Sequence, residues 1–238
     1  MKKTRFLIAA VALLSTSLIS AQAQTADEIV KKHVDAVGGL DNWKKVNSIR
    51  MSGSMNAGGT ELPVIVTTVN GKGYRMEFTM NGMTNYMILT PTNGWSCFPV
   101  SGQTKPEAVP DETVKEEQDQ LDVSMDALID YKAKGNTVTY LGKDQVEGTD
   151  CFKLKVVNKN GKEETDFLDA SNYYCIRTVE KSKANGKEQE SITNLSNYQK
   201  LPEGIVFPMS IESDGGPITL KTVEVNKQVD ESIFKPGR

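Results

Sequence analysis

Two Asn-Gly pairs, Asn70-Gly71 and Asn81-Gly82, stand between runs in which apolar and polar residues alternate. This is the strongest short-range signal for a two-residue β-hairpin, because both residues tolerate the positive φ angles that such turns need. Strands joined this tightly must pair in antiparallel fashion. The chain after Val46 is therefore predicted to begin as an antiparallel meander.

Alternation continues over most of the chain and predicts two groups of strands separated by a break. The predicted strands are at 46–56, 61–69, 72–80, 83–90 and 93–98, and then at 136–143, 146–158, 163–169, 173–183, 187–199, 205–213 and 217–229. About twelve twisted antiparallel strands cannot stay flat. We expect a mainly β (α+β) fold, a single large curved antiparallel sheet that forms an unclosed β-barrel.

Three segments are predicted to be helical. Residues 25–28 form a capping box, and the apolar residues that follow it at helical spacing end at Gly38-Gly39. The break between the strand groups contains a polar loop at 99–110. It continues with a strongly acidic segment at 111–122 and a segment at 124–133 that has an apolar side. We expect a helix in each of these last two segments.

Six of the nine methionines lie between Met51 and Met87, most of them at alternate positions of predicted strands, so one sheet face collects them. Methionine is unbranched and polarisable, and a Met-rich face can adapt to an irregular apolar partner such as an acyl chain. The alternative is that these residues fill an ordinary core. The candidate ligand-binding residues of a hydrophobic cavity are Met51, Met55, Met76, Phe78, Met80, Met87, Trp95, Met125 and Leu128.

The first 23 residues have the pattern of a secretory signal peptide. A basic start precedes an apolar run at 6–14, which is too short to span a bilayer, and Ala21-Gln22-Ala23 supplies a cleavage site. No linker rich in Pro, Gly or Ser divides the remainder. We therefore expect residues 24–238 to form one exported domain.

The composition offers no support for a metal or catalytic site. His33 is the only histidine, and its place on the apolar face of the first helix indicates a packed side chain. Cys97, Cys151 and Cys175 lack the close spacing of zinc ligands; Cys151 with Cys175 is the pair to test for a bridge. A net charge of −3, well mixed along the chain, argues against a nucleic-acid partner. We expect no cofactor, no metal and no catalytic residue.

A series of short motifs covers nearly all of the chain after the signal peptide. The series consists of Gly38-Gly39 after the first helix, Tyr74-Arg75-Met76-Glu77, Pro91-Thr92-Asn93-Gly94-Trp95, Phe98-Pro99, Phe167-Leu168-Asp169, Ile176-Arg177, Tyr198 and Gly204-Ile205-Val206-Phe207-Pro208. It resembles the LolA/LolB-like family of periplasmic outer-membrane lipoprotein carriers, also called lipoprotein-sorting proteins.

The resemblance implies an unclosed barrel whose apolar concave face is covered by helices, with those at 111–122 and 124–133 as the moving cover. It also implies a periplasmic carrier or chaperone, expected to be a monomer, for acyl chains of lipoproteins in transit to the outer membrane. An inner-membrane ABC transporter and an outer-membrane acceptor would be its partners. Arg75 matches a strand arginine that helps to hold the closed state through contacts with the covering helices.

Two other functions stay open. The same cavity would suit an envelope protein that binds another lipid or apolar small molecule. An enzyme would need a pocket with convergent polar groups of perturbed pKa, for example a cluster of acids around Arg75, and no motif predicts one. We expect a binding protein, not an enzyme, and the sequence does not identify its cargo.

Overall fold

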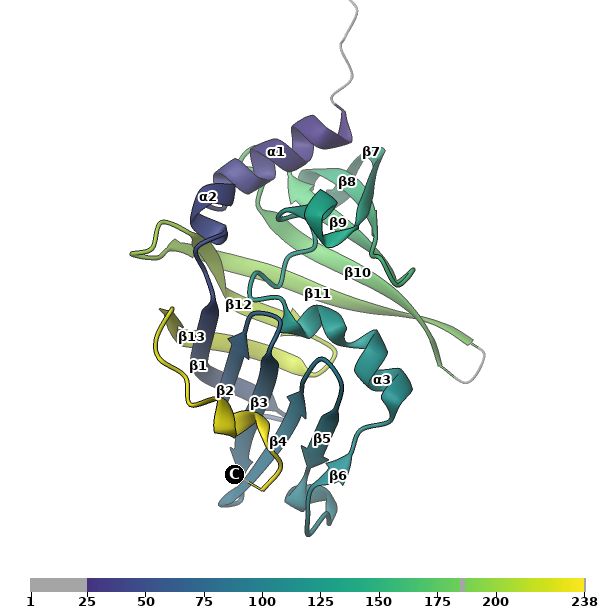
Figure 1. The fold of residues 1–238 in the computed structure, drawn as a ribbon. Helices are drawn as coiled ribbons and strands as arrows, with labels where there is room; N and C mark the ends of the chain where they lie inside the picture. Colours follow the sequence, from purple (N-terminus) through teal and green to yellow (C-terminus); the bar gives the residue numbers. More distant parts are fainter. Residues whose placement is uncertain (1–24, 185–186, 238) are drawn as a thin grey trace, which may run out of the picture.

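The computed structural model describes residues 25–184 and 187–237. The predicted signal peptide and residues 185–186, between the strands predicted at 173–183 and 187–199, lie outside the described residues. The described chain forms one antiparallel sheet of 13 strands with short helices around it (Figure 1). Within these ranges no helix is long and apolar enough to cross a membrane.

The first half of the sheet is the predicted meander. Its strands are β1 (Ser48–Ala57), β2 (Thr60–Val69), β3 (Gly73–Met80), β4 (Met83–Leu89), β5 (Gly94–Cys97) and β6 (Glu107–Ala108). Both Asn-Gly pairs lie in turns, and Asn81 has a φ of 53°. β6 falls in the segment predicted to be a loop, because two residues are too few to show alternation.

The second half follows the break. Its strands are β7 (Thr137–Val146), β8 (Thr149–Val157), β9 (Glu163–Asp169), β10 (Cys175–Ala184), β11 (Lys187–Lys200), β12 (Val206–Ser213) and β13 (Gly216–Val225). The strand order is β6-β5-β4-β3-β2-β1-β13-β12-β11-β10-β9-β8-β7, so pairing of β1 with β13 joins the halves. β6 and β7 form opposite edges. The predicted single, curved, unclosed antiparallel sheet is confirmed.

Two helices at the N-terminus lie at one end of the sheet (Figure 1). α1 (Ala26–Ala36) begins with the predicted capping box, in which Thr25 Oγ1 accepts a hydrogen bond from the Glu28 amide at 3.2 Å. Its buried residues Ile29 and Val30 belong to a hydrophobic cluster with residues of β8 and β9. α2 (Leu40–Trp43) follows after Gly38 and Gly39, which have φ angles of 109° and 84°.

The segment 111–134, which we call the cover, lies over the concave side of the sheet. It contains α3 (Asp111–Glu116), η2 (Gln118–Leu121) and α4 (Tyr131–Lys134). The helix predicted at 111–122 is present as α3 and η2, but the one predicted at 124–133 is reduced to α4. Met125 and Asp130 have φ angles of 51°, and Asp122 Oδ1 accepts the Ser124 amide at 2.9 Å. Such local side-chain bonds compete with a helix.

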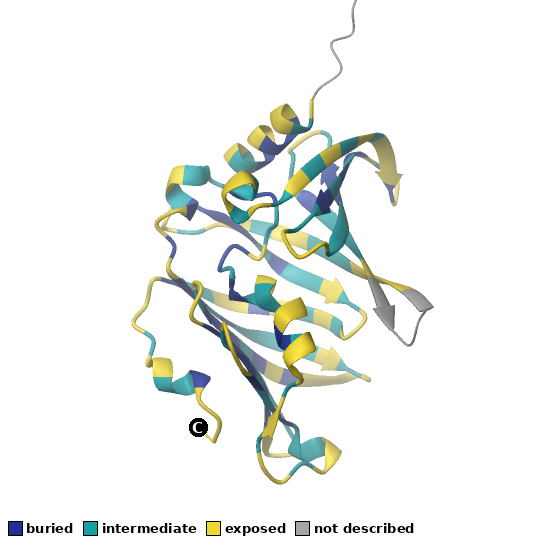
Figure 2. Ribbon diagram, turned by 45° about the vertical axis from the view of Figure 1, so that its right-hand side comes forward, coloured by how far each residue is buried: buried dark blue, intermediate teal, exposed yellow. Residues whose placement is uncertain are grey.

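The C-terminal segment packs on the other side of the β1–β5 half. Figure 2 shows it and α3 on opposite sides of these strands. It contains η3 (Glu231–Phe234), and the Phe234 ring lies so close to Gly73 that a Cβ atom there would be 2.5 Å from it. The remaining short helix, η1 (Pro99–Ser101), follows β5. Both faces of this half of the sheet are therefore partly covered.

Candidate ligand-binding cavity

A cavity of about 760 Å³ lies between the cover and the concave face of β9–β12. Its apolar lining comes from α2, the cover and the strands, and comprises Val37, Leu40, Trp43, Val46, Leu121, Val123, Ile129, Val156, Leu195, Val206, Phe207 and Ile211. Exposed residues such as Pro91, Met125 and Asn160 also line it, so it opens to solvent between the cover and the sheet. The volume lies within the range of about 300–1,000 Å³ that is usual for small-molecule sites.

Close contacts between the segment that leads into α2 and the segment that leads into β12 shape the apolar wall. A Cβ atom on Gly38 would lie 2.4 Å from the Gly204 carbonyl oxygen, so only glycine lets the two segments approach this closely. The approach brings the Val206 amide within 2.9 Å of the Val37 carbonyl. The indole nitrogen of Trp43 donates to the same carbonyl at 2.9 Å, which satisfies its polar atom while the ring stays in the wall.

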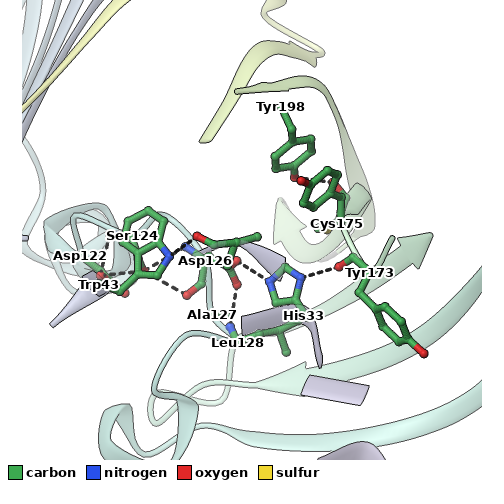
Figure 3. A network of polar contacts seen from close by, with 12 residues as sticks. His33, Trp43, Asp122, Ser124, Asp126, Ala127, Leu128, Tyr173, Cys175 and Tyr198 are labelled. Atoms are coloured by element: carbon green, nitrogen blue, oxygen red, sulfur yellow. Dashed lines mark hydrogen bonds and ion pairs between the residues drawn. The ribbon is translucent and has the colours of Figure 1, made fainter. Parts of the chain in front are cut away.

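His33 connects the cover to the rest of the molecule. Its Nδ1 lies 2.7 Å from the Tyr173 carbonyl and its Nε2 lies 2.8 Å from Asp126 (Figure 3). Burial lowers the pKa of His33, but the charge and hydrogen bond of Asp126 outweigh it and raise this pKa above its ordinary value. Conversely, burial raises the pKa of Asp126, but the charge of His33 outweighs it and lowers that pKa. The two form an ion pair between α1 and the cover, in which His33 is fully buried and Asp126 is partly buried.

A lysine connects the cover to the sheet. Lys162, at the turn before β9, lies 2.9 Å from Asp119 of η2 and 3.1 Å from Glu180 of β10. Lys134 acts within the cover, where it donates to the Asp126 carbonyl at 2.8 Å and to Ser124 Oγ at 3.0 Å. The cover is therefore fixed by polar contacts over a lining that is mainly apolar.

Carboxylates form a separate region of the lining. Asp126, Glu164, Asp166 and Glu180 all border the cavity. Burial, followed by the charge of Glu180, raises the pKa of Glu164 to about 7. Burial, followed by the charge of Glu164, raises the pKa of Asp166 well above its ordinary value. Within the described chain, no group of three or more His, Cys, Asp or Glu side chains could hold a metal ion.

Sequence reasoning missed this acidic region. Acidic residues alternating along a strand are usually a solvated face, and Glu164 and Asp166 gave no reason to depart from that interpretation. The one available signal was Leu168, which continues the same alternate set and is fully buried. The period would have placed Glu164 and Asp166 on the inner face with Leu168, although it would not have shown that a cavity lies there.

The predicted methionine face exists, but most of it is not beside the cavity. The register aligns Met51, Val66, Met76 and Met87 in one row across β1–β4. Met51 is buried; Met55, Met76, Phe78 and Met87 are partly buried against the same core, and Met80 is partly buried beside them. Among the predicted residues, the cavity lining includes Met125. A ligand contact at the others stays a prediction.

Three other predicted features have different surroundings. Leu128 is buried with α1 and β8 residues, and Trp95 packs on the opposite face of the sheet with Tyr86 and Phe234. Cys97, Cys151 and Cys175 are buried free thiols. Cys151 and Cys175 belong to different hydrophobic clusters, so the bridge considered between them is absent.

Arg75 lies on the same outer face as Trp95. Its Nε donates to Glu77 at 2.7 Å, its Nη1 donates to the Ile233 carbonyl at 3.0 Å, and its guanidinium stacks over Tyr86 at 4.3 Å. These partners belong to β3, β4 and the C-terminal segment and not to the cover. A role of Arg75 in the closed state stays a prediction, and any such effect must act through the sheet.

Solved structures with a similar fold include a LolA superfamily protein and two others. A LolA superfamily protein from Nitrosomonas europaea is 10% identical and has a TM-score of 0.55, with 90% of this chain and 99% of that chain covered. A putative outer membrane lipoprotein-sorting protein domain from Vibrio parahaemolyticus is 12% identical, has a TM-score of 0.52, and is matched over 87% of this chain and 94% of its own.

A DUF1329 family protein from Desulfovibrio piger is 13% identical and has a TM-score of 0.50, over 89% of this chain and 98% of that one. No protein-family sequence profile and no curated protein sequence matches the chain. The similarity is therefore structural, and it confirms the LolA-like resemblance at the level of the fold.

Proposed function

We propose that this chain is a periplasmic carrier or chaperone that binds the acyl chain of a lipoprotein in transit to the outer membrane. The observation that supports this most strongly is the cavity of about 760 Å³ with an apolar wall beneath a tethered cover. Burial of an acyl chain there is worth about 0.8 kcal/mol per CH₂ group, so no covalent chemistry is needed for capture. Release requires the cover to open.

The structural neighbours support the same proposal. The domain from Vibrio parahaemolyticus is described as a putative outer membrane lipoprotein-sorting protein, and its fold matches this one over most of both chains. The proposal includes export by the signal peptide and action as a monomer. It also includes supply of the cargo by an inner-membrane ABC transporter and its delivery to an outer-membrane acceptor. The alternative function is that of an envelope protein that binds another lipid. The carboxylates of the cavity lining favour this alternative.

Binding of an uncharged fluorescent probe, N-phenyl-1-naphthylamine, to residues 24–238 tests the cavity. We expect probe fluorescence to rise on binding and a purified lipoprotein to displace the probe. Thr193→Trp should weaken probe binding at least tenfold, because Thr193 lines the cavity and a bulky ring there would fill it.

Ile192→Trp is the matched control. Ile192 immediately precedes Thr193 on β11, is 40% exposed and faces the other side of the sheet. This change should therefore leave probe binding unaltered. Absence of probe binding to the folded protein would refute the proposal. Two measurements separate the two functions. A small lipid found by mass spectrometry in an extract of the purified chain favours the alternative. Lipoprotein sorting that depends on the gene favours the carrier.

A further inference from the structure

The carboxylates of the cavity lie on neighbouring strands. Glu164 of β9 is directly opposite Glu180 of β10, and Asp166 is opposite Thr178 in the next inward-facing row. Asp126 approaches from the cover. Like charges directly opposite each other across two strands are destabilising. A purely apolar ligand would not offset the repulsion between these carboxylates.

Two of these carboxylates have cations as partners. Asp126 is paired with His33, and Glu180 is paired with Lys162. The nearby Lys134 is engaged by Asp122 and by Ser124 and the Asp126 carbonyl. His33, Lys162 and Lys134 are therefore already bound to other groups, and Lys159, which also borders the cavity, forms no ion pair with these carboxylates in the described chain.

Asp166 has no such partner. Its residue is 3% exposed, it borders the cavity, and its Oδ1 atom has no hydrogen bond anywhere in the described chain. Glu164 likewise forms no ion pair within the residues that the structure describes. A buried carboxylate oxygen without a donor costs free energy, and buried polar atoms in folded proteins are nearly always paired. The missing donor is what a ligand would supply.

Val156 of β8, opposite Glu164, is apolar, and on the other side of β9 the apolar wall begins two strands away from Asp166. Along the sheet from β9, Thr178 and Thr193 are followed by Leu195 and Ile211, which are opposite each other on β11 and β12. The lining thus changes from acidic to apolar over a few strands. A molecule with a donor group at one end and a hydrocarbon chain at the other matches this order.

We propose that the cavity binds an amphiphile that carries a protonated primary amine beside its apolar chain, with the ammonium group at Asp166 and Glu164 and the chain along β11 and β12. An ammonium has three N–H donors and a positive charge, so it satisfies Asp166 Oδ1 and offsets the Glu164 charge together. Burial and the neighbouring carboxylates raise the pKa values of both carboxyls, and a cation placed between them would act in the opposite direction. This inference rests on the proposed function and specifies its ligand.

Displacement of N-phenyl-1-naphthylamine by three compounds of equal chain length tests it: dodecylamine, 1-dodecanol and dodecanoic acid, each below its micelle-forming concentration. We expect dodecylamine to displace the probe at a concentration at least tenfold lower than dodecanol, and dodecanoic acid to be the weakest. Asp166→Asn should remove most of the advantage of the amine and leave dodecanol unchanged. Glu164→Gln, a second isosteric change, should act in the same direction if Asp166→Asn does not fold.

Glu163→Gln is the matched control, because Glu163 precedes Glu164 on β9, faces the other side and pairs with Lys155 at 2.7 Å. It should keep the preference for the amine. Equal displacement by amine and alcohol, or an equal loss of both in Asp166→Asn, would overturn the inference while leaving the proposed function intact. Failure of the probe and all three compounds to bind would overturn both. Lysophosphatidylethanolamine and an S-palmitoyl-cysteinyl peptide with a free amino group then distinguish a lipid amine from a peptide amine.

Discussion

The imidazole of His33 is fully buried and faces two acceptors, a backbone carbonyl and a carboxylate. Both ring nitrogens must carry a proton if Asp126 is ionised, so the pair is an imidazolium with a carboxylate. The helical spacing of apolar residues correctly predicted a packed histidine. It did not predict Asp126, which is 93 residues away in the chain and on a segment without regular structure.

His33→Ala should lower the free energy of unfolding by about 2–3 kcal/mol at pH 6, because it leaves Asp126 without its buried partner. The raised pKa of His33 means that this stabilisation is fully present below its ordinary pKa of 6.5 and is lost as pH rises through the folded value. Urea unfolding from pH 5 to pH 9 measures the difference between the two proteins. A difference that does not shrink at high pH would contradict the ion pair.

Lys31→Ala provides the control for that experiment. Lys31 is on the same helix, and its side chain, which pairs with Asp35, is 75% exposed. Exposed pairs of this kind contribute little, so the change should cost less than about 0.5 kcal/mol at every pH.

At the scale of elements, alternation and turn chemistry predicted the strands well, because period two and Asn-Gly turns are local properties of the sequence. The cover was harder to predict. Its turns depend on two local hydrogen bonds, in which Asp122 Oδ1 accepts the Ser124 amide and Ser124 Oγ accepts the Asp126 amide. Its position over β9–β12 depends on contacts with Lys162 and His33. The sequence therefore predicted which face is apolar, but not which part of that face remains open.

Lys162→Met should loosen the cover, since it removes the contact that joins η2 to β10. We expect hydrogen exchange of the amides at 118–130 to become about fivefold faster, which corresponds to roughly 1 kcal/mol of local stability. The association rate of N-phenyl-1-naphthylamine should rise in parallel. Exchange in α1 should not change.

Lys159→Met is the comparison for the cover, because Lys159 borders the same cavity, is exposed, and forms no ion pair within the described residues. In Lys159→Met, hydrogen exchange of the amides at 118–130 and the association rate of the probe should match those of the unaltered protein. Equal acceleration in both variants would mean that the charge near the cavity mouth, and not the connection to the cover, sets the rate of opening.

At the scale of the whole molecule, the two halves of the sheet are continuous only through β1 and β13. The register shifts between Ser52 and Gly53 in this pair, and a Cβ atom on Gly53 would lie 2.2 Å from the Thr219 carbonyl oxygen. Alternation placed Gly53 on the apolar face but could not show this close approach, because it depends on a strand at the other end of the chain. The prediction that residues 24–238 form one domain depends on the same junction.

Gly53→Ala should therefore destabilise both halves together, by about 1–3 kcal/mol, because β1 and β13 must separate to admit the methyl group. Trp43, beside Phe207 of β12, reports on one half, and Trp95 of β5 reports on the other. Thermal unfolding followed by fluorescence in Trp43→Phe and Trp95→Phe backgrounds measures each half separately. Gly215→Ala, where the nearest atom to the new Cβ would be 3.7 Å away, should leave both midpoints in place. An unfolding midpoint that falls for one tryptophan alone would show that the halves unfold as separate units. In a single cooperative unit, a destabilising change at the junction lowers the midpoint that both tryptophans report.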